Sequence, residues 1–331
     1  MNLPAAKPVL GLPSIEVIVV AFNSAESLAT CLAALPAAGE GLELRVTVID
    51  NCSAEDIGST VRNSGICAEV VRSQVNLGYG GGNNIGIRRA LQKRPLPDAI
   101  LVLNPDVELP PATISKLYFI LEETRCGAVS PQIRDRSGMK QENPLRTLWG
   151  RRIRPGDLKG RPSTSVDRLP GSCMLICTEA LVRVGLFDER YFLYWEEIDL
   201  CVRLRRAKYE LLIAEDVVAA HGGAGESSLR RHRTYYMWRN QIYFSFKNYG
   251  LLLGFIFVAE RLFVANAREV FRYVRRGRSD LILAGLAGLW AGLRGEVGPS
   301  ASRFALPRNP LPGESTPDQG REKDGAVAAH I

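Results

Sequence analysis

An apolar run that ends in a turn, ILVLNPD at residues 100–106, constrains the fold of this chain most. Four apolar residues bounded by turn chemistry predict a strand buried on both faces, and Pro105 ends it because proline has no N–H. The strand therefore carries Asp106 to its C-terminal edge, where open α/β sheets bind ligands. A carboxylate there is a candidate for holding a divalent metal and, through it, a phosphate. Taken alone, Asp106 is equally well explained as part of a turn.

Three earlier segments, residues 15–21, 44–49 and 69–72, are rich in apolar or β-branched residues and predict further strands. Between the first two, the apolar positions from 28 to 35 fall at helical spacing. Strand, helix and strand with polar residues at each strand end form the pattern of a parallel sheet, so we expect an α/β protein.

A glycine-rich segment, NLGYGGGNNIG at residues 76–86, follows the third predicted strand. We expect it to be a loop ahead of a helix, where glycines let backbone N–H groups approach a phosphate and the helix dipole favours the anion. Its glycine spacing is not the dinucleotide fingerprint, and no Lys-Ser/Thr follows the glycines as in a P-loop. A flexible connector is the alternative.

A second candidate site follows the aromatic segment 191–195 and contains Glu196, Glu197 and Asp199. Acids in a first helical turn are favoured by the helix dipole, so these three could simply stabilise a helix start. However, they repel one another, and the aromatic residues before them would raise the pKa of a carboxylate by desolvation. A general base is tuned in this way.

Composition and charge bound the remaining possibilities. With 331 residues, 46% of them hydrophobic and 23% charged, the chain is long enough for one large domain and an appendage. Basic residues crowd into the second half and give a formal net charge of +7, which indicates anionic partners, either phosphate groups or a membrane surface. We see no nucleic-acid recognition motif and expect no nucleic acid.

Seven cysteines without a Cys-x-x-Cys pair and a start without an apolar signal core favour a cytoplasmic protein.

The pattern changes after Ser228, where arginines alternate with aromatic residues before the apolar segment 251–258. We expect no apolar stretch of the roughly 20 residues that a bilayer span needs, because Glu260 and Arg261 interrupt one stretch and residues 281–293 are too few. Basic and aromatic helices of this kind lie in a membrane interface, and a helical dimer face is the alternative.

In chain order, these motifs resemble the nucleotide-sugar half of family 2 inverting glycosyltransferases, and most of all the bacterial rhamnosyltransferase-like branch. The resemblance spans residues 15–221, about two thirds of the chain. The residues that carry it are Phe22-Asn23 with Glu26, Asp50-Asn51-x-Ser53 with Asp56, Asn76-x-Gly78 through Asn83-x-x-Gly86, and Asn104-Pro105-Asp106.

The resemblance implies a donor site at these strand ends. Phe22 and Asn23 would line the base and ribose pocket, and Asp50 would accept a hydrogen bond from the base. The implied donor-binding residues are Phe22, Asn23, Glu26, Asp50, Asn76, Gly78, Asn83, Asn104 and Asp106.

The resemblance also implies a metal and a catalytic base. Asp106 would hold Mg²⁺ or Mn²⁺ on the diphosphate, and Asn104 replaces a further acid of the family, which implies a weakly held, substrate-carried ion. His221, which the sequence alone favours as structural, would complete the metal shell as a neutral imidazole. Glu197 would be the catalytic base. The residues implied as supports or acceptor contacts are Glu196, Asp199, Trp195, Gly171 and Ser172.

We therefore expect a GT-A-like α/β domain with a mostly parallel sheet flanked by helices, and a C-terminal helical segment. The expected boundaries are an N-terminal extension at 1–13, a glycosyltransferase domain at 14–227, a basic and aromatic segment at 228–303 and a disordered tail at 304–331. Within the domain, the donor half would end near residue 110, and residues 134–168 would form a loop region with little regular structure.

The expected reaction is inverting transfer of a sugar, first of all L-rhamnose from dTDP-rhamnose, to a hydroxyl of a lipid-linked or polysaccharide acceptor. Such an enzyme would serve cell-envelope or exopolysaccharide synthesis. It would lie peripherally on the inner face of the cytoplasmic membrane, and a homodimer is a further option. The alternatives are a family 2 transferase that uses a UDP- or GDP-sugar, a nucleotidyltransferase, and a non-catalytic glycan-binding relative. The lack of a Gly-x-Gly-x-Arg signature after the first strand argues against the nucleotidyltransferase.

Overall fold

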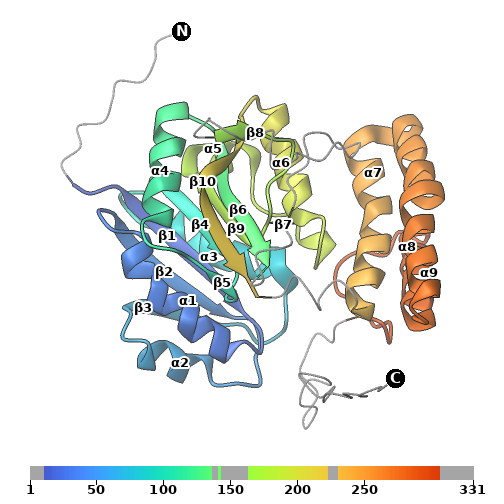
Figure 1. Cartoon of the computed structure of the whole chain (residues 1–331), viewed down its shortest axis with the longest axis horizontal. Coiled ribbons are helices and arrows are strands. Elements are labelled where there is room, and N and C mark those ends of the chain that lie inside the picture. Colours follow the sequence, from blue (N-terminus) through green and yellow to red (C-terminus); the bar gives the residue numbers. More distant parts are fainter. Residues whose placement is uncertain (1–10, 136–140, 143–162, 223–229, 306–331) are drawn as a thin grey trace, which may run out of the picture.

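A computed structural model describes residues 11–135, 141–142, 163–222 and 230–305. Most of the expected N-terminal extension and loop region, and the tail beyond residue 305, lie outside the described residues. The described chain forms a central sheet with helices on both faces, and a group of C-terminal helices lies beyond α6 (Figure 1). The α/β class with a C-terminal helical segment is thus confirmed.

The first half of the sheet is parallel, as the sequence predicts. Its strands follow the order β3-β2-β1-β4, and each neighbouring pair runs in the same direction. These strands are β1 (Ser14–Ala21), β2 (Glu43–Asp50), β3 (Ala68–Arg72) and β4 (Ala99–Leu103). Because parallel strands end at the same edge of a sheet, the polar residues that follow them gather there.

The second half of the sheet mixes strand directions. β9 enters antiparallel between β4 and β6, β6 and β10 run parallel, and β5 pairs antiparallel with β10. The parallel arrangement therefore holds for β1 to β4 and for the β6–β10 pair. The strands of this half are β5 (Val107–Glu108), β6 (Ala128–Asp135), β7 (Gln141–Glu142), β8 (Ser163–Ser165), β9 (Cys173–Cys177) and β10 (Leu211–His221). β7 and β8 fall in the segment expected to have little regular structure.

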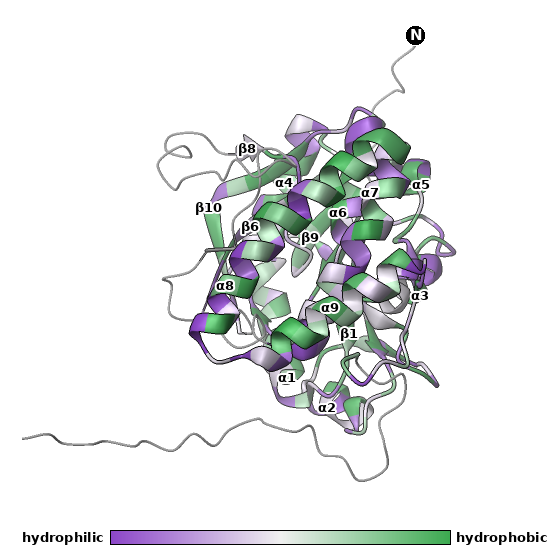
Figure 2. Cartoon of the chain, turned by 90° about the vertical axis from the view of Figure 1, so that its right-hand side faces the viewer, coloured by the Kyte–Doolittle hydropathy of each residue, from purple (hydrophilic) through white to green (hydrophobic). Residues whose placement is uncertain are grey.

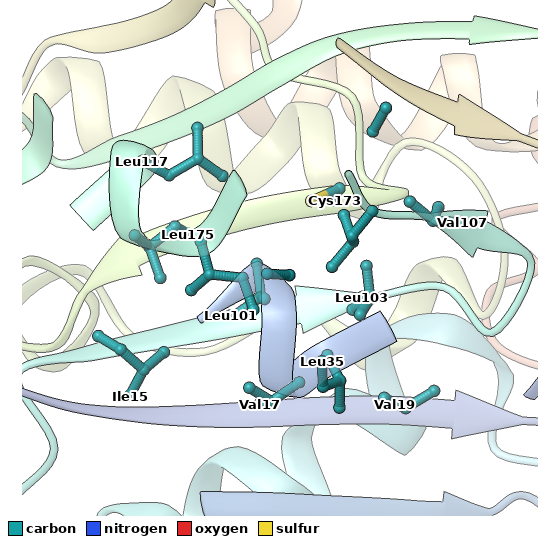
Figure 3. Packing of buried hydrophobic residues seen from close by; sticks show 14 of the residues in the cluster. Ile15, Val17, Val19, Leu35, Leu101, Leu103, Val107, Leu117, Cys173 and Leu175 are labelled. Carbon is teal, nitrogen blue, oxygen red and sulfur yellow. The ribbon is translucent and has the colours of Figure 1, made fainter. Parts of the chain in front are cut away.

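Alternation along the strands sends side chains into two cores, one on each face of the sheet. On β1, Val17 and Val19 join the first core, whereas Ile18 joins the second. In Figure 3, Leu35 of α1 and Leu117 of α4 pack on the first face. Residues of α3, α5 and α6 fill the second core. The helices of the domain are α1 (Ala25–Ala38), α2 (Ile57–Asn63), α3 (Gly78–Ala90), α4 (Thr113–Thr124), α5 (Thr178–Val184), η2 (Glu189–Tyr191) and α6 (Glu196–Arg206).

The glycine-rich segment is helical, which corrects the expectation of a loop ahead of a helix. Its glycines lie within α3 and let that helix approach β1 closely. An added Cβ would lie 2.7 Å from the Val20 side chain at Gly82 and 2.7 Å from the Ile18 side chain at Gly86. A glycine inside a helix costs up to about 1 kcal/mol relative to alanine, and this close packing offsets that cost.

The C-terminal helices form a hairpin with a further helix packed on it. Gly250 (φ 70°, ψ −169°) breaks α7, and the chain after it folds back along the first arm. Consistent with this return, Arg261 Nε lies 3.3 Å from Gln241 Oε1, and Trp238 Nε1 donates a 2.9 Å hydrogen bond to Glu269 Oε2. The elements are α7 (Arg231–Glu260), η4 (Arg261–Asn266), α8 (Ala267–Arg275) and α9 (Ser279–Leu293).

By length and composition alone, the helical stretch Arg231–Arg275, which Gly250 divides into two arms, is long and apolar enough to cross a membrane, and 22% of its apolar window is buried within the described chain. This corrects the expectation that no stretch is long enough. The reason is that Glu260 and Arg261 interrupt the apolar run without ending the helix.

Candidate active site

The C-terminal edge of the sheet brings Asp106 and His221 together. Antiparallel pairing of β5 with β10 sets His221 opposite Val107, and the Gly222 N–H donates a 2.9 Å hydrogen bond to the Asp106 carbonyl. His221 Nε2 consequently lies 3.1 Å from Asp106 Oδ1. The Nδ2 of Asn104 is 3.5 Å from the same imidazole nitrogen. The Asp106 side chain keeps 31% of its surface exposed, so a ligand can reach it.

Asp106 and His221 fit a divalent metal that arrives with a substrate. Together they offer carboxylate oxygens and one imidazole nitrogen, which Mg²⁺ and Mn²⁺ accept. In the described ranges, no group of three acidic, histidine or cysteine side chains converges on one point. Phosphate oxygens of the substrate would therefore have to supply most of the other ligands, which is a normal arrangement for magnesium.

Asp50, at the end of β2, is buried in a hydrogen-bonded turn. Its Oδ1 accepts a 2.8 Å hydrogen bond from the Ser53 N–H, and its Oδ2 lies 3.2 Å from the Arg72 guanidinium. Asn23 has φ 49° and ties this turn to the end of β1, since its N–H donates to Ser53 Oγ and its Oδ1 accepts from the Ala54 N–H. Arg72, at the end of the third strand, was not among the expected site residues, and the structure places it beside Asp50.

Asn51 and Asn76 hold the start of α3. Asn51 Nδ2 donates to Asn76 Oδ1 at 3.0 Å and to the Gly78 carbonyl at 3.1 Å. The N–H groups of Leu77 and Gly78 donate to these two side chains, and the Tyr79 N–H donates to a carbonyl of the segment before α6. These three N–H groups are therefore bonded within the protein, which argues against the phosphate role expected for this segment. Asn51 is a second residue that the expected site omitted.

Gly171 and Ser172 connect the Asp106 edge with Glu197. The Asn104 N–H donates a 2.8 Å hydrogen bond to the Ser172 carbonyl. A Cβ added at Gly171 would lie 3.2 Å from the Glu197 Cβ, so the two residues are in contact. The Tyr79 hydroxyl donates to the Gly171 carbonyl and fixes this turn from α3. The two regions that the sequence identified separately thus flank one short turn.

Glu196 and Glu197 lie in different environments. Glu196 is 3% exposed, and its Oε2 has no hydrogen-bond partner within the described part of the chain, whereas Glu197 is half-buried. Burial, reinforced by the negative charge of Glu197, raises the pKa of Glu196 well above its ordinary range. The raised pKa favours the protonated form of Glu196, and Glu197 is the more accessible of the two carboxyls.

Trp195 and Asp199 face α7. Trp195 Nε1 donates a 3.0 Å hydrogen bond to the Met237 carbonyl. Asp199 is fully buried, with its Oδ1 2.6 Å from Lys247 Nζ and its Oδ2 2.9 Å from Arg203 Nε. Both side chains are buried and therefore support the segment that carries the glutamates.

Three other expected donor residues lie near the end of β1 or inside α3. Phe22 is half-buried just after β1, and Glu26 is exposed in the first turn of α1. Asn83 is 1% exposed inside α3, where its Nδ2 donates a 3.0 Å hydrogen bond to the Tyr79 carbonyl. Phe22 and Glu26 thus lie near the end of β1, whereas Asn83 is directed into the protein.

Comparison with known proteins places this site in a family. Residues 16–189 match the family model for glycosyl transferase family 2, a range that contains Asp106 and Gly171 and ends before Glu197 and His221. The chain is 31% identical over 254 residues to the low-salt glycan biosynthesis hexosyltransferase Agl10 of Haloferax volcanii, with 74% of this chain and 77% of that protein covered. It is 30% identical over 224 residues to an N-acetylglucosaminyl-diphospho-decaprenol L-rhamnosyltransferase of Mycobacterium tuberculosis, with 58% and 71% covered.

Solved structures share the fold. The mannosyltransferase PcManGT of Pyrobaculum calidifontis, in complex with GDP-Man and Mn²⁺, aligns with a TM-score of 0.56 at 16% identity, over 87% of this chain and 89% of that one. Residues 1–349 of S. aureus TarS, in complex with UDP-GlcNAc, align with a TM-score of 0.53 at 15% identity, over 82% and 79%. The fold is therefore that of the GT-A glycosyltransferases. From the family match and the extended identity to a hexosyltransferase, this chain belongs to glycosyl transferase family 2 and is similar to its rhamnosyltransferase-like branch.

Proposed function

We propose that this glycosyltransferase inverts the anomeric centre of a nucleotide-diphosphate sugar, with Glu197 as the catalytic base. The observation that supports this most directly is the turn at Gly171 and Ser172, which touches Glu197 on one side and the strand end before Asp106 on the other. A leaving diphosphate at Asp106 and a base at Glu197 could then address opposite faces of one sugar. Inversion needs a single base in that position.

Asp106 and His221 would hold Mg²⁺ or Mn²⁺ on the donor diphosphate, where the ion neutralises the charge that develops on the leaving group. Glu197 would accept the proton of the acceptor hydroxyl. Burial and the neighbouring Glu197 favour the protonated form of Glu196, which lowers the repulsion between the two carboxyls. The structure of PcManGT in complex with GDP-Man and Mn²⁺ supports the presence of a divalent ion in this fold.

The donor that we propose is dTDP-L-rhamnose, and the acceptor is a hydroxyl of a lipid-linked or polysaccharide sugar. The proposal rests on similarity to a mycobacterial L-rhamnosyltransferase whose name specifies a decaprenol-linked acceptor. UDP- and GDP-sugars are the alternatives, because TarS and PcManGT were solved with donors of those kinds.

A panel of dTDP-rhamnose, UDP-GlcNAc and GDP-mannose with Mn²⁺ would test the donor. The true donor should raise the melting temperature most, since ligand binding stabilises by mass action, and should release its nucleoside diphosphate on turnover. Product NMR would then show an inverted anomeric configuration. Retention of configuration would refute the inverting reaction, and binding without turnover of any donor would favour a non-catalytic glycan-binding relative.

The C-terminal helices carry the second part of the proposal, which is attachment to an anionic membrane surface. Large apolar side chains are exposed on the part of α7 that follows Gly250, including Leu252 (76%) and Phe255 (63%). Further exposed apolar side chains lie along η4, α8 and α9. Figure 2 shows hydrophobic stretches of α7 and α9 on this side of the molecule. Arg268, Arg272 and Arg275 of α8 are exposed beside them. Each arginine near such a surface contributes about 1 kcal/mol, screened by salt.

Sedimentation with vesicles that contain phosphatidylglycerol would test this attachment. Leu252→Asp/Phe255→Asp should abolish binding at low salt, whereas Phe119→Asp, at a residue on α4 that is equally exposed (66%), should not. Unchanged vesicle binding in the double variant would contradict the proposal. If the wild-type protein does not bind vesicles but forms a dimer that the double variant loses, the surface serves self-association.

A further inference from the structure

We infer that Asn240 of α7 is a positioning residue for Glu197, an inference that rests on the proposed role of Glu197 as base. The arrangement behind it is a contact between the C-terminal helices and the backbone of the segment directly before α6, residues 191–195. Asn240 does not approach the reacting atoms, so its effect must pass through that segment.

The segment before α6 has an unusual backbone. Phe192 (φ 66°, ψ −60°) is the centre of a left-handed γ-turn, which the 2.9 Å hydrogen bond from the Leu193 N–H to the Tyr191 carbonyl closes. Tyr194 (φ 65°) and Trp195 (φ 80°) also have positive φ. Each such conformation of a non-glycine residue is unfavourable and persists only where surrounding contacts enforce it. Glu196 and Glu197 follow at once, so this backbone sets where the base points.

Asn240 supplies the contacts on one side of the segment. Its Nδ2 lies within hydrogen-bond distance of three carbonyls, those of Tyr191 (2.9 Å), Leu193 (2.8 Å) and Tyr194 (2.9 Å). Arg239 fixes the orientation of this amide, because its Nε donates a 2.9 Å hydrogen bond to Asn240 Oδ1. Asn240 is 2% exposed, so water does not readily replace these bonds.

The donor half supplies the contact on the other side. The Tyr79 N–H donates a 2.9 Å hydrogen bond to the Phe192 carbonyl. A Cβ on Gly78 would lie 2.0 Å from the same oxygen, so only glycine admits this approach. The segment is therefore held between α3 and α7, and on the α7 side Asn240 is the residue that reaches the Leu193 and Tyr194 carbonyls, while Arg239 Nη2 donates to the Tyr191 carbonyl. Loss of the Asn240 bonds would let the glutamates drift relative to the bound sugar, and a misplacement of about 1 Å can cost about 100-fold in rate.

The test compares two changes of amide to carboxylate at adjacent buried positions of α7. In Asn240→Asp, the Leu193 and Tyr194 carbonyls lose the Asn240 donor, whereas the Tyr191 carbonyl keeps bonds from Arg239 Nη2 and the Leu193 N–H. Arg239 can still pair with the new carboxylate. Gln241→Glu is the matched control, because Gln241 is fully buried but contacts Arg261 instead of the segment. The readouts are hydrogen–deuterium exchange of residues 191–195, affinity for dTDP-rhamnose with Mn²⁺, and turnover measured as dTDP release.

Asn240→Asp should speed exchange in the segment and lower kcat by about 10- to 100-fold with nearly unchanged donor affinity and binding stoichiometry. Gln241→Glu should change none of these. Unchanged exchange in Asn240→Asp, or faster exchange with wild-type kcat, would overturn the inference while leaving the proposed function standing. A wild-type protein that turns over no donor would overturn the proposed function, and the role of Asn240 toward a base with it.

Discussion

The substitution Asp199→Asn tests how strongly the C-terminal helices are joined to the glycosyltransferase domain. Asp199 is fully buried and paired with Arg203 and Lys247. Breaking a buried pair typically costs about 3–5 kcal/mol, because the partner charges remain buried. Here the lower end applies, since Lys247 keeps a 2.7 Å contact with Asp188 and Arg203 keeps bonds to three backbone carbonyls. We expect Asp199→Asn to lower the free energy of unfolding by about 3 kcal/mol.

Urea unfolding followed by tryptophan fluorescence measures this loss, because Trp195 stacks on Phe244 of α7 with ring centroids 4.8 Å apart. The matched control is Glu122→Gln, which breaks an exposed ion pair with Arg125 and should cost less than about 1 kcal/mol. A loss in Asp199→Asn no larger than that of the control would refute the assignment of Asp199 as the link between α6 and α7.

Two further predictions concern the charged groups of the site. Because the folded pKa of Glu196 is raised, the stability that its proton contributes is full below the ordinary pKa of 4.5 and is lost as pH rises through the folded value. Between pH 4.5 and the folded pKa of Glu196, the free energy of unfolding of the wild type should therefore fall by up to about 1.4 kcal/mol per pH unit more than that of Glu196→Gln. Equal pH dependence of the free energy of unfolding in variant and wild type would contradict this. Asp106→Asn should weaken Mn²⁺-dependent donor binding by at least about 10- to 100-fold, to the affinity of wild type in EDTA, in calorimetric titrations. Full Mn²⁺-dependent affinity in the variant would remove Asp106 from the metal site.

Local pattern was sufficient to locate the strand ends at which Asp50 and Asp106 lie. Apolar runs bounded by turn residues predicted β1, β2, β3 and β4, and the Asn-Pro-Asp turn placed Asp106 at their common edge. The acids after the aromatic segment predicted the start of α6. These features depend on residues close in sequence, so a single chain reveals them.

Features that depend on distant residues were not accessible in this way. The strand order, with β9 antiparallel between β4 and β6, depends on pairing over long sequence separations. The glycines at 78–86 form a helix because α3 packs closely on β1, which the local sequence does not reveal. The same holds for Asp199, whose partner Lys247 lies 48 positions further along the chain. The helix also continues through Glu260 and Arg261, although two adjacent charges interrupt the apolar run in the sequence.

The turnover of Glu197→Gln with the donor that the wild type uses tests most directly whether Glu197 is the catalytic base. A carboxylate within hydrogen-bond reach of the acceptor hydroxyl typically contributes about 10²–10⁴-fold to the rate, so turnover should fall by that factor while donor affinity stays nearly intact. Glu196→Gln should lose less. Near-normal turnover in Glu197→Gln together with an inactive Glu196→Gln would assign the base to Glu196, and activity in both variants would show that these acids only support the start of α6.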